Sequence, residues 1–311
     1  MNTPSVRPGL RVVLAAWVLL TACSRKPGQY TPQYAAAQPE PGAIPRYSFG
    51  VPPIRHVRSL WDRYSRLIQV LNISGTRFTL KLESAQTPDA YDLKLRQGVL
   101  AFAIVDPYQV LVAEHLGYTV IARTGRADRI QGVMIVARAS GIHRVRDLQG
   151  RTIAFTNPTA LAATLLNQYD LFESGLRIAV RSTIRYTHSP ETSLLNVALG
   201  QADAAGVSAS DWEDFQRDNT DAAAKLAVLR RTDTLSGPAV MASHAVSSSD
   251  VRGLQESLVR LSASADGRTA LERAGVSAFL PGDSVSYDDV WDFLQRYQQV
   301  LGPLPDRPGA Q

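Results

Sequence analysis

The segment FTNPTALAATLL, residues 155–166, predicts a buried strand that ends in a turn and leads directly into a helix. The turn begins at Asn157-Pro158, where the proline fixes its own backbone and disfavours helical geometry in the residue before it. The first N–H groups of a helix have no partner within the helix, so they attract negative charge. The segment is therefore typical of an anion-binding turn.

Strands and helices alternate on both sides of this segment. A strand opens at Tyr47, and apolar residues at helical spacing predict an amphipathic helix over 54–71. Further strands are expected at 77–83, 100–105, 118–122, 131–137, 151–155, 180–186, 203–207, 226–230 and 238–242. Further helices are expected at 88–97, 107–116, 159–173, 190–199, 209–217 and 287–301, the last capped by Ser286. Two such series predict an α/β protein with two lobes, each a mixed, mostly parallel sheet flanked by helices.

The first 22 residues are typical of an export signal. Two arginines and no acidic residue lead into the apolar run Val12–Leu20, which is followed by Thr21-Ala22 and the single cysteine, Cys23. The run is about half the ~20 residues that a helix needs to cross a bilayer. The pattern indicates a lipoprotein signal with acylation at Cys23, and a plain secretory signal with a stray thiol is the alternative. Residues 23–46 are rich in Pro, Gln and Ala without apolar periodicity, so we expect a flexible tether.

Composition argues against several classes of function. The chain carries a formal charge of +5, but its arginines are scattered and form no basic run with interleaved aromatics, so no nucleic-acid partner is expected. The five histidines show no metal-ligand spacing, and the sequence contains no GxSxG elbow, P-loop or GxGxxG fingerprint. We therefore expect no metal, no cofactor and no catalytic activity.

Candidate binding residues follow the expected strands, because ligands of open parallel sheets lie beyond the carboxyl ends of the strands. These residues are Tyr108, Thr156, Asn157, Thr159, His188, Ser189, Ser208 and Asp211. Each also has a structural interpretation. Asn157, Thr159 and Ser189 fit helix caps, and His188 fits an exposed loop.

Other polar and aromatic side chains near the expected strand ends leave the sign of the ligand open. Tyr108, Trp212 and Tyr91 fit either the core or a ligand-stacking role. Asp106 and Asp211 would suit a cationic ligand, whereas Arg55 and Arg58 would suit an anion if they are not simply solvated.

Several longer phrases resemble a known family. They are YSFGVPP at 47–53, LKLRQGVLAFAIVDPYQVLVA at 93–113, the phrase QGVMIVARASGIHRVRDLQGRTIAFTNPTALAATLL at 131–166 and YTHSPETSLLNVALGQADAAGVSASDWEDF at 186–215. In this order they are similar to the phosphonate/phosphite-type substrate-binding proteins of ABC transporters, over residues 47–245 or so.

The resemblance implies a two-lobed, type II periplasmic-binding-protein fold hinged by two crossing strands. It places lobe one at 47–130, lobe two at 131–234, and a return to lobe one at 235–311 with C-terminal helices and a loose tail. The implied function is capture of a small anion between the lobes and delivery to an ABC permease in the inner membrane. We expect an exported monomer, anchored in the cell envelope through acylated Cys23, that faces the periplasm or lies on the outer face of the cytoplasmic membrane. A sensing lipoprotein of the same fold and an enzyme that reuses it are the alternatives.

The sequence departs from the family's binding residues at three points. The family's turn Asp-Pro-Ala-Ser-Thr-Ser-Gly is aligned with Asn157-Pro158-Thr159-Ala160-Leu161-Ala162-Ala163, so apolar residues replace three hydroxyl donors. The family's helix-opening histidine is aligned with Pro190, and its lobe-one tyrosine is aligned with Val110. We therefore expect an anion-compatible turn whose walls suit a ligand with more apolar surface than the family's usual ligands.

Overall fold

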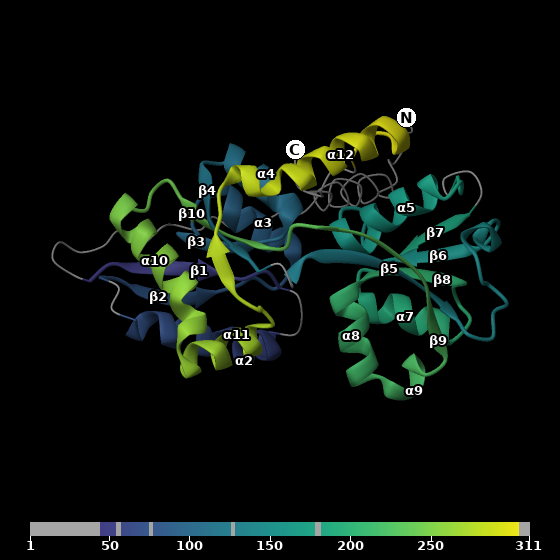
Figure 1. Ribbon diagram of the computed structural model, residues 1–311, viewed down its shortest axis with the longest axis horizontal. Coiled ribbons are helices and arrows are strands. Elements are labelled where there is room, and N and C mark those ends of the chain that lie inside the picture. The colour runs from purple at the N-terminus through teal and green to yellow at the C-terminus, as the bar shows by residue number, and fades with distance from the viewer. Residues whose placement is uncertain (1–43, 54–56, 75–76, 126–127, 178–181, 305–311) are drawn as a thin grey trace, which may run out of the picture. The chain divides into compact units, whose positions relative to one another are not determined.

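The computed structural model describes residues 44–53, 57–74, 77–125, 128–177 and 182–304 (Figure 1). Cys23, the expected signal and tether up to residue 43, Arg55 and the side chain of Arg58 lie outside this description. All strands and core clusters described below come from residues 44–304, so a chain that begins at Ser24 retains them all.

The first sheet has six strands in the order β11-β4-β10-β3-β1-β2. Their bounds are β1 (Arg46–Gly50), β2 (Thr79–Glu83), β3 (Phe102–Val105), β4 (Tyr118–Thr124), β10 (Ala239–Ser243) and β11 (Phe279–Pro281). β1 pairs in parallel with β2 and β3, whereas β10 is antiparallel to both β3 and β4, and β11 is antiparallel to β4. Four strands therefore run in one direction and two in the other, which gives the expected mixed sheet; two of its five pairings are parallel and three are antiparallel, because β10 lies between β3 and β4.

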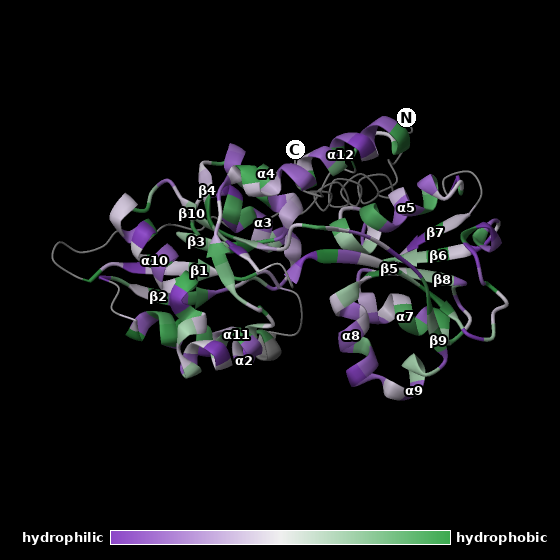
Figure 2. Cartoon of the chain, in the orientation of Figure 1, coloured by the Kyte–Doolittle hydropathy of each residue, from purple (hydrophilic) through white to green (hydrophobic). Residues whose placement is uncertain are grey.

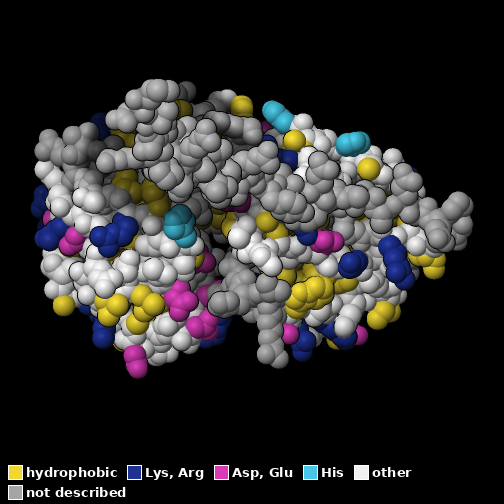
Figure 3. Space-filling view, turned by 180° about the vertical axis from the view of Figure 1, so that it is seen from behind, with side chains coloured by type: hydrophobic (Ala, Val, Ile, Leu, Met, Phe, Trp, Pro, Cys, Tyr) yellow, Lys and Arg dark blue, Asp and Glu magenta, His cyan; other side chains and the backbone are white. Residues whose placement is uncertain are grey.

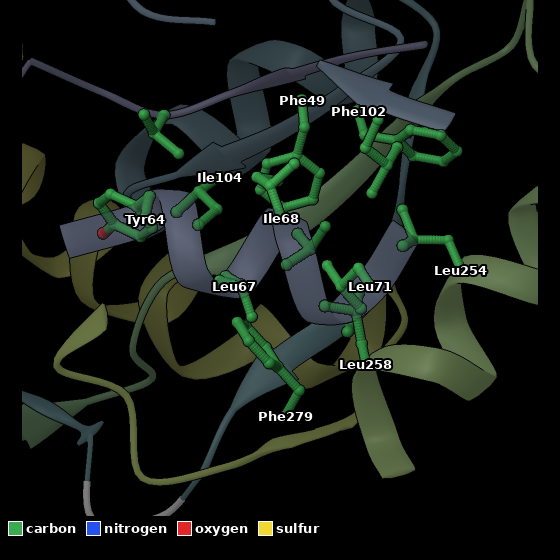
Figure 4. Packing of buried hydrophobic residues seen from close by; sticks show 14 of the residues in the cluster. Phe49, Tyr64, Leu67, Ile68, Leu71, Phe102, Ile104, Leu254, Leu258 and Phe279 are labelled. Atoms are coloured by element: carbon green, nitrogen blue, oxygen red, sulfur yellow. The ribbon is translucent and has the colours of Figure 1, made fainter. Parts of the chain in front are cut away.

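Helices cover both faces of this sheet. They are α2 (Val57–Ile73), α10 (Ser248–Arg260) and α11 (Ala265–Ala274) on one face, and α3 (Pro88–Arg96), α4 (Pro107–His115) and α12 (Asp288–Leu301) on the other. The alternation of side chains along a strand explains the division, because Phe102 and Ile104 enter the first core while Ala103 and Val105 enter the second. Figure 4 shows Ile68 of α2 beside Phe49 of β1, with Leu67 on the side of Phe279 of β11.

The second sheet has five strands in the order β7-β6-β8-β5-β9. Their bounds are β5 (Ile130–Ala137), β6 (Thr152–Phe155), β7 (Thr183–Tyr186), β8 (Ala204–Ser208) and β9 (Leu226–Leu235). β6 is parallel to β7 and β8, and β5 is antiparallel to β8 and β9, so four of the five strands share a direction. The inner strands β8 and β10 are buried along almost their whole length, and Figure 2 shows that α12 carries both hydrophilic and hydrophobic stretches.

Helices also flank the second sheet. A π-helix, η3 (Leu161–Leu166), continues directly into α5 (Asn167–Glu173), and Leu171 joins a core with Met134 and Phe155. The other face packs on α7 (Pro190–Ala198), α8 (Ala209–Asp218) and the short α9 (Thr220–Ala223). The 3₁₀ turns are η2 (Val145–Leu148), η4 (Leu261–Ala263) and η5 (Ser284–Tyr287).

Two adjacent segments connect the sheets. β4 leads to β5, and β9 returns to β10; at the point of crossing, Ile130 is paired with Leu235. The Arg129 guanidinium bonds to the hydroxyl and carbonyl oxygens of Thr234 at 2.9 and 2.8 Å. A Cβ on Gly237 would lie 2.2 Å from the carbonyl oxygen of Asp128, so only glycine fits between the two connections.

Several details differ from the sequence-based expectations. β9 extends to Leu235 rather than ending near 230, because its outer residues lie in an exposed edge strand that needs no apolar run. The helix expected from residue 159 begins at Leu161 as a π-helix. Ser286 does not cap the last helix: it lies inside η5, where its hydroxyl donates to Asp283 Oδ1, and α12 continues directly from that turn. β11 was not expected from the sequence.

Candidate functional site

The turn after β6 is held together by Asn157. Its side-chain Oδ1 accepts hydrogen bonds from the amide and the hydroxyl of Thr159, at 3.0 and 3.2 Å. Its backbone carbonyl accepts the hydroxyl of the fully buried Thr164 at 2.6 Å. Asn157 and Thr159 therefore shape the turn, in line with the structural interpretation of both residues, and Thr159 has both of its donors occupied.

The helix that follows this turn has an open N-terminus. Its N-cap residue is Ala160, whose side chain cannot accept a hydrogen bond, and the carbonyl of Ala160 accepts the amides of Thr164 and Leu165. Within the described part of the chain, the amides of Leu161, Ala162 and Ala163 have no acceptor. All three residues are at least 92% buried, at 5%, 8% and 5% exposure. A buried helix end of this kind is stabilised when an anion accepts its N–H groups.

Two glycines bring this helix end onto the second sheet. A Cβ on Gly132 of β5 would lie 2.6 Å from the carbonyl oxygen of Ala162, and one on Gly206 of β8 would lie 2.7 Å from that of Ala163. The Asn167 side chain, only 2% exposed, donates to the same two carbonyls and to that of Val207. The backbones of β5 and β8 thus lie directly against the carbonyl groups of the first helical turn. This contact fixes the position of the amides in the same turn.

The neighbouring helices at strand ends are already capped. Asp106 accepts the amide of Gln109 in α4 at 2.9 Å, and Ser208 accepts that of Asp211 in α8 at 3.1 Å. Ser189 accepts the amide of Thr192 in α7 at 3.4 Å. Side-chain caps satisfy N–H groups that an external anion would otherwise use. Among the helices after β3, β6, β7 and β8, only the one after β6 lacks such a cap within the described residues.

Thr156 provides a further polar group at this turn. Its side chain is 8% exposed, and its hydroxyl has no hydrogen-bond partner in the described structure. Its carbonyl accepts the amide of His188 at 2.7 Å, which places the turn after β7 beside the turn after β6. His188 has a positive φ of 61° and an exposed side chain. A buried hydroxyl without a hydrogen-bond partner lowers the stability of the folded protein. A ligand that bonds to the Thr156 hydroxyl would therefore stabilise the protein.

The structure brings most of the predicted residues to one edge of the second sheet. Thr156, Asn157 and Thr159 follow β6, and His188 and Ser189 follow β7. Ser208 is the last residue of β8, the other neighbour of β6, and Asp211 follows it. The carboxylate of Asp211 accepts the Ser208 hydroxyl at 2.5 Å, so these two side chains bind each other. Tyr108 belongs to the first sheet's α4, and packs against the apolar cluster that contains Leu161 and Ala162.

Two other aromatic candidates lie in the cores. Trp212 is 4% exposed and stacked against Phe215. Tyr91 is 1% exposed and donates its hydroxyl to the carbonyl of Ile104. Their environment corresponds to the core interpretation.

Sequence reasoning missed the residues that hold the helix end. Asn167, Gly132 and Gly206 were not selected, although glycine within a strand is a known sign of close backbone approach. The segment 155–166 itself contains no titratable side chain, so any anion at its amides would be held by backbone dipoles and hydroxyls rather than by a counter-charge. Among the described residues, no cluster of His, Cys, Asp or Glu is arranged to hold a metal.

Solved structures share this architecture. A binding-protein component of an ABC phosphonate transporter from Pseudomonas aeruginosa has a TM-score of 0.72 at 17% identity, over 86% of this chain and 91% of that one. PhnD1 from Prochlorococcus marinus, solved with methylphosphonate, also has a TM-score of 0.72, at 14% identity over 83% of this chain and 100% of that one. The aliphatic sulphonate-binding protein of Escherichia coli has a TM-score of 0.58 at 13% identity, over 86% and 96% of the two chains. Curated proteins provide no match.

The two sheets, the paired connections and the open helix end define a type II periplasmic binding protein, an α/β fold with two lobes. The family model for the periplasmic phosphonate substrate-binding proteins of ABC transporters matches residues 49–287. The chain belongs to this family, as its sequence resemblance predicted. The family is one of exported transport components rather than enzymes, which favours transport over the sensing and enzymatic alternatives.

Proposed function

We propose that this protein captures a small phosphonate- or phosphate-like anion at the turn after β6 and delivers it to an ABC permease. One observation carries the proposal: the buried amides of Leu161, Ala162 and Ala163 and the buried hydroxyl of Thr156 lack partners in the described structure. An oxyanion has several acceptor oxygens and is able to accept from such a group of donors at once.

The side chains of the same turn suggest what the rest of the ligand is like. Ala160, Leu161 and Ala162 stand where the family's usual turn has Ser-Thr-Ser, so the oxyanion is gripped mainly by backbone amides. Apolar side chains beside the amides favour a ligand that joins an anionic head to an organic group. An alkylphosphonate, such as the methylphosphonate of the Prochlorococcus protein, combines both features.

The remaining candidates are assigned to the same ligand. In this proposal His188 and Ser189 approach from the turn after β7, Ser208 and Asp211 from that after β8, and Tyr108 from the first lobe. Residues 47–130 and 235–311 form lobe one and residues 131–234 form lobe two, with the connections around Arg129 and Gly237 as the hinge. Ligand binding between the lobes would then stabilise a closed form that the permease recognises.

We also assign the membrane attachment to Cys23. Removal of residues 1–22 and acylation of Cys23 would leave a monomeric binding domain on a tether at the outer face of a membrane, facing the periplasm. The sequence of the signal supports this attachment. Among the described residues no helix has the length and apolar character needed to cross a bilayer.

Isothermal titration of the chain from Ser24 tests the ligand assignment. We expect methylphosphonate, phosphite or phosphate to bind, and ethanesulfonate, acetate and cationic amines to bind at least tenfold more weakly. A saturating ligand should also raise the melting temperature, since binding at 100 times Kd adds about 2.7 kcal/mol of stability. Binding of an amine but of no phosphorus oxyanion would overturn the assignment.

A further inference from the structure

A polar hollow lies on the first sheet's side of the molecule, where α10 meets the chain just before β2. It is separate from the turn after β6. Its lining residues are Ser74, Arg77, Phe78, Ser249, Asp250, Arg252, Gly253, Glu256, Ser257 and Arg260. Three guanidinium groups and two carboxylates therefore share one hollow.

The charges in this hollow are not all paired. Glu256 binds Arg260 at 2.9 Å, and Asp250 accepts the hydroxyls of Tyr47 and Ser247, each at 2.8 Å. Arg77 and Arg252 are exposed and have neither an ion pair nor a hydrogen bond within the described structure. Two unpaired guanidinium groups that face one hollow favour an anion between them, and the planar guanidinium suits a phosphate group.

The place of Arg77 in the chain and in the first sheet suggests the source of that phosphate. The carbonyl of Pro45 accepts the amide of Thr79 at 2.9 Å, and Arg46 is paired with Thr79 in the sheet. Arg77 is therefore two residues from the point where the tether joins the folded chain. Twenty residues, 24–43, separate Cys23 from the first described residue. The tether that we propose for these residues would have a root-mean-square span of about 25 Å.

We propose that this hollow binds the phosphate of an anionic phospholipid headgroup and so holds lobe one against the membrane. The location of the lipid rests on the proposed anchor at Cys23, while the hollow and its charges do not. Tethering raises the local concentration of headgroups, so a weak site is sufficient. Attraction to an anionic membrane surface is about 1 kcal/mol per arginine, which is about fivefold in binding for each.

Vesicle sedimentation tests this site without the anchor. The chain from Ser24, which has no acyl group, is mixed with vesicles of equal parts phosphatidylglycerol and phosphatidylcholine. We expect binding that weakens with added salt, and Arg77→Gln with Arg252→Gln should lower it about 30-fold. The matched control is Arg273→Gln with Arg296→Gln, which removes the same charge from exposed positions of α11 and α12 and should lower binding by less than threefold.

The outcomes distinguish a phospholipid site from a general effect of charge and from a site for free phosphate. An equal loss of vesicle binding in both double variants would show a general effect of charge and would overturn the proposed site. Failure of the parent chain to bind anionic vesicles would also overturn it. Inhibition of vesicle binding by a few millimolar inorganic phosphate, with phosphate bound tightly by calorimetry, would assign the hollow to free phosphate instead. Loss of membrane attachment in cells on Cys23→Ala concerns the anchor alone and leaves the vesicle result unaffected.

Discussion

Gly132 of β5 lies directly against Ala162 of the helix that follows β6. A Cβ at position 132 would be 2.6 Å from the Ala162 carbonyl oxygen and 2.8 Å from the side-chain nitrogen Nδ2 of Asn167. Gly132 is also two residues from Ile130, where the chain enters the second sheet. The strand that links the sheets is therefore in direct backbone contact with the helix end whose first amides have no acceptor among the described residues.

This contact predicts a large effect of one methyl group. Gly132→Ala should lower the free energy of unfolding by about 1–3 kcal/mol through overpacking and should also weaken ligand binding, because the helix end must shift. Urea unfolding and calorimetry measure both quantities. Gly253→Ala is the control, since its Cβ would only touch Phe78 at 3.9 Å; helix propensity predicts a gain of up to about 1 kcal/mol. Unchanged stability of Gly132→Ala would contradict the close approach.

Thr156 and Thr164 should respond in opposite ways to replacement by valine. The Thr156 hydroxyl has no partner, so Thr156→Val should leave the apo stability unchanged or slightly higher while weakening anion binding about tenfold or more. The Thr164 hydroxyl bonds to Asn157, so Thr164→Val should cost about 1–3 kcal/mol of stability. Thermal melts with and without phosphonate distinguish the two. Full affinity in Thr156→Val would remove that hydroxyl from the site.

The buried hydroxyl of Tyr297 should make the folded protein less stable in alkaline solution. Its hydroxyl donates to Gln168 at 2.6 Å, and burial, followed by the neighbouring Tyr186, raises its pKa to about 12. Because the folded-state pKa is above the unfolded value of about 10, the stabilisation is present below pH 10 and is lost as the pH rises through 12. Tyr297→Phe should therefore show a smaller fall in urea midpoint between pH 9 and pH 12 than the parent chain. Equal falls in the urea midpoints of the parent chain and the variant would show that Tyr297 does not cause the loss of stability.

Cys23→Ala should release the protein from the membrane fraction into the soluble fraction of the envelope. Acylation at this cysteine is the expected attachment, and the described residues contain no spanning helix. Fractionation with an immunoblot measures the change, and Ser24→Ala serves as the neighbouring control. Continued membrane association of Cys23→Ala would point to attachment through the protein or through an uncleaved signal.

Periodicity predicted most of the elements because most are buried on one face. The apolar stripe of α2, for example, contains Leu60, Tyr64, Leu67 and Leu71, which all enter the core. The end of β9 could not be predicted, because an edge strand facing solvent reads as polar from Arg230 to Thr234. The three residues of β11 are too few to show a period.

The position of the candidate anion-binding turn was predictable, but the groups that form the turn were only partly so. Asn157-Pro158 marked the turn, and the neighbouring turns were correctly placed at the same sheet edge. The open amides depend on a missing cap at Ala160 and on a π-helical first turn, which the sequence LAATLL does not distinguish from an α-helix.

Lys and Arg side chains are spread over several places on the face shown in Figure 3, in keeping with the scattered arginines of the sequence.

We propose that an oxyanion binds to the helix end that follows β6. The most direct test is a nuclear magnetic resonance titration of the chain from Ser24, labelled with ¹⁵N at alanine and leucine. Addition of methylphosphonate should move the amide protons of Leu161, Ala162 and Ala163 strongly downfield, as expected for charge-assisted hydrogen bonds. Ala265, the first residue of the capped helix α11, should move much less. Binding with large shifts elsewhere and none at residues 161–163 would contradict the assignment of the oxyanion to this helix end.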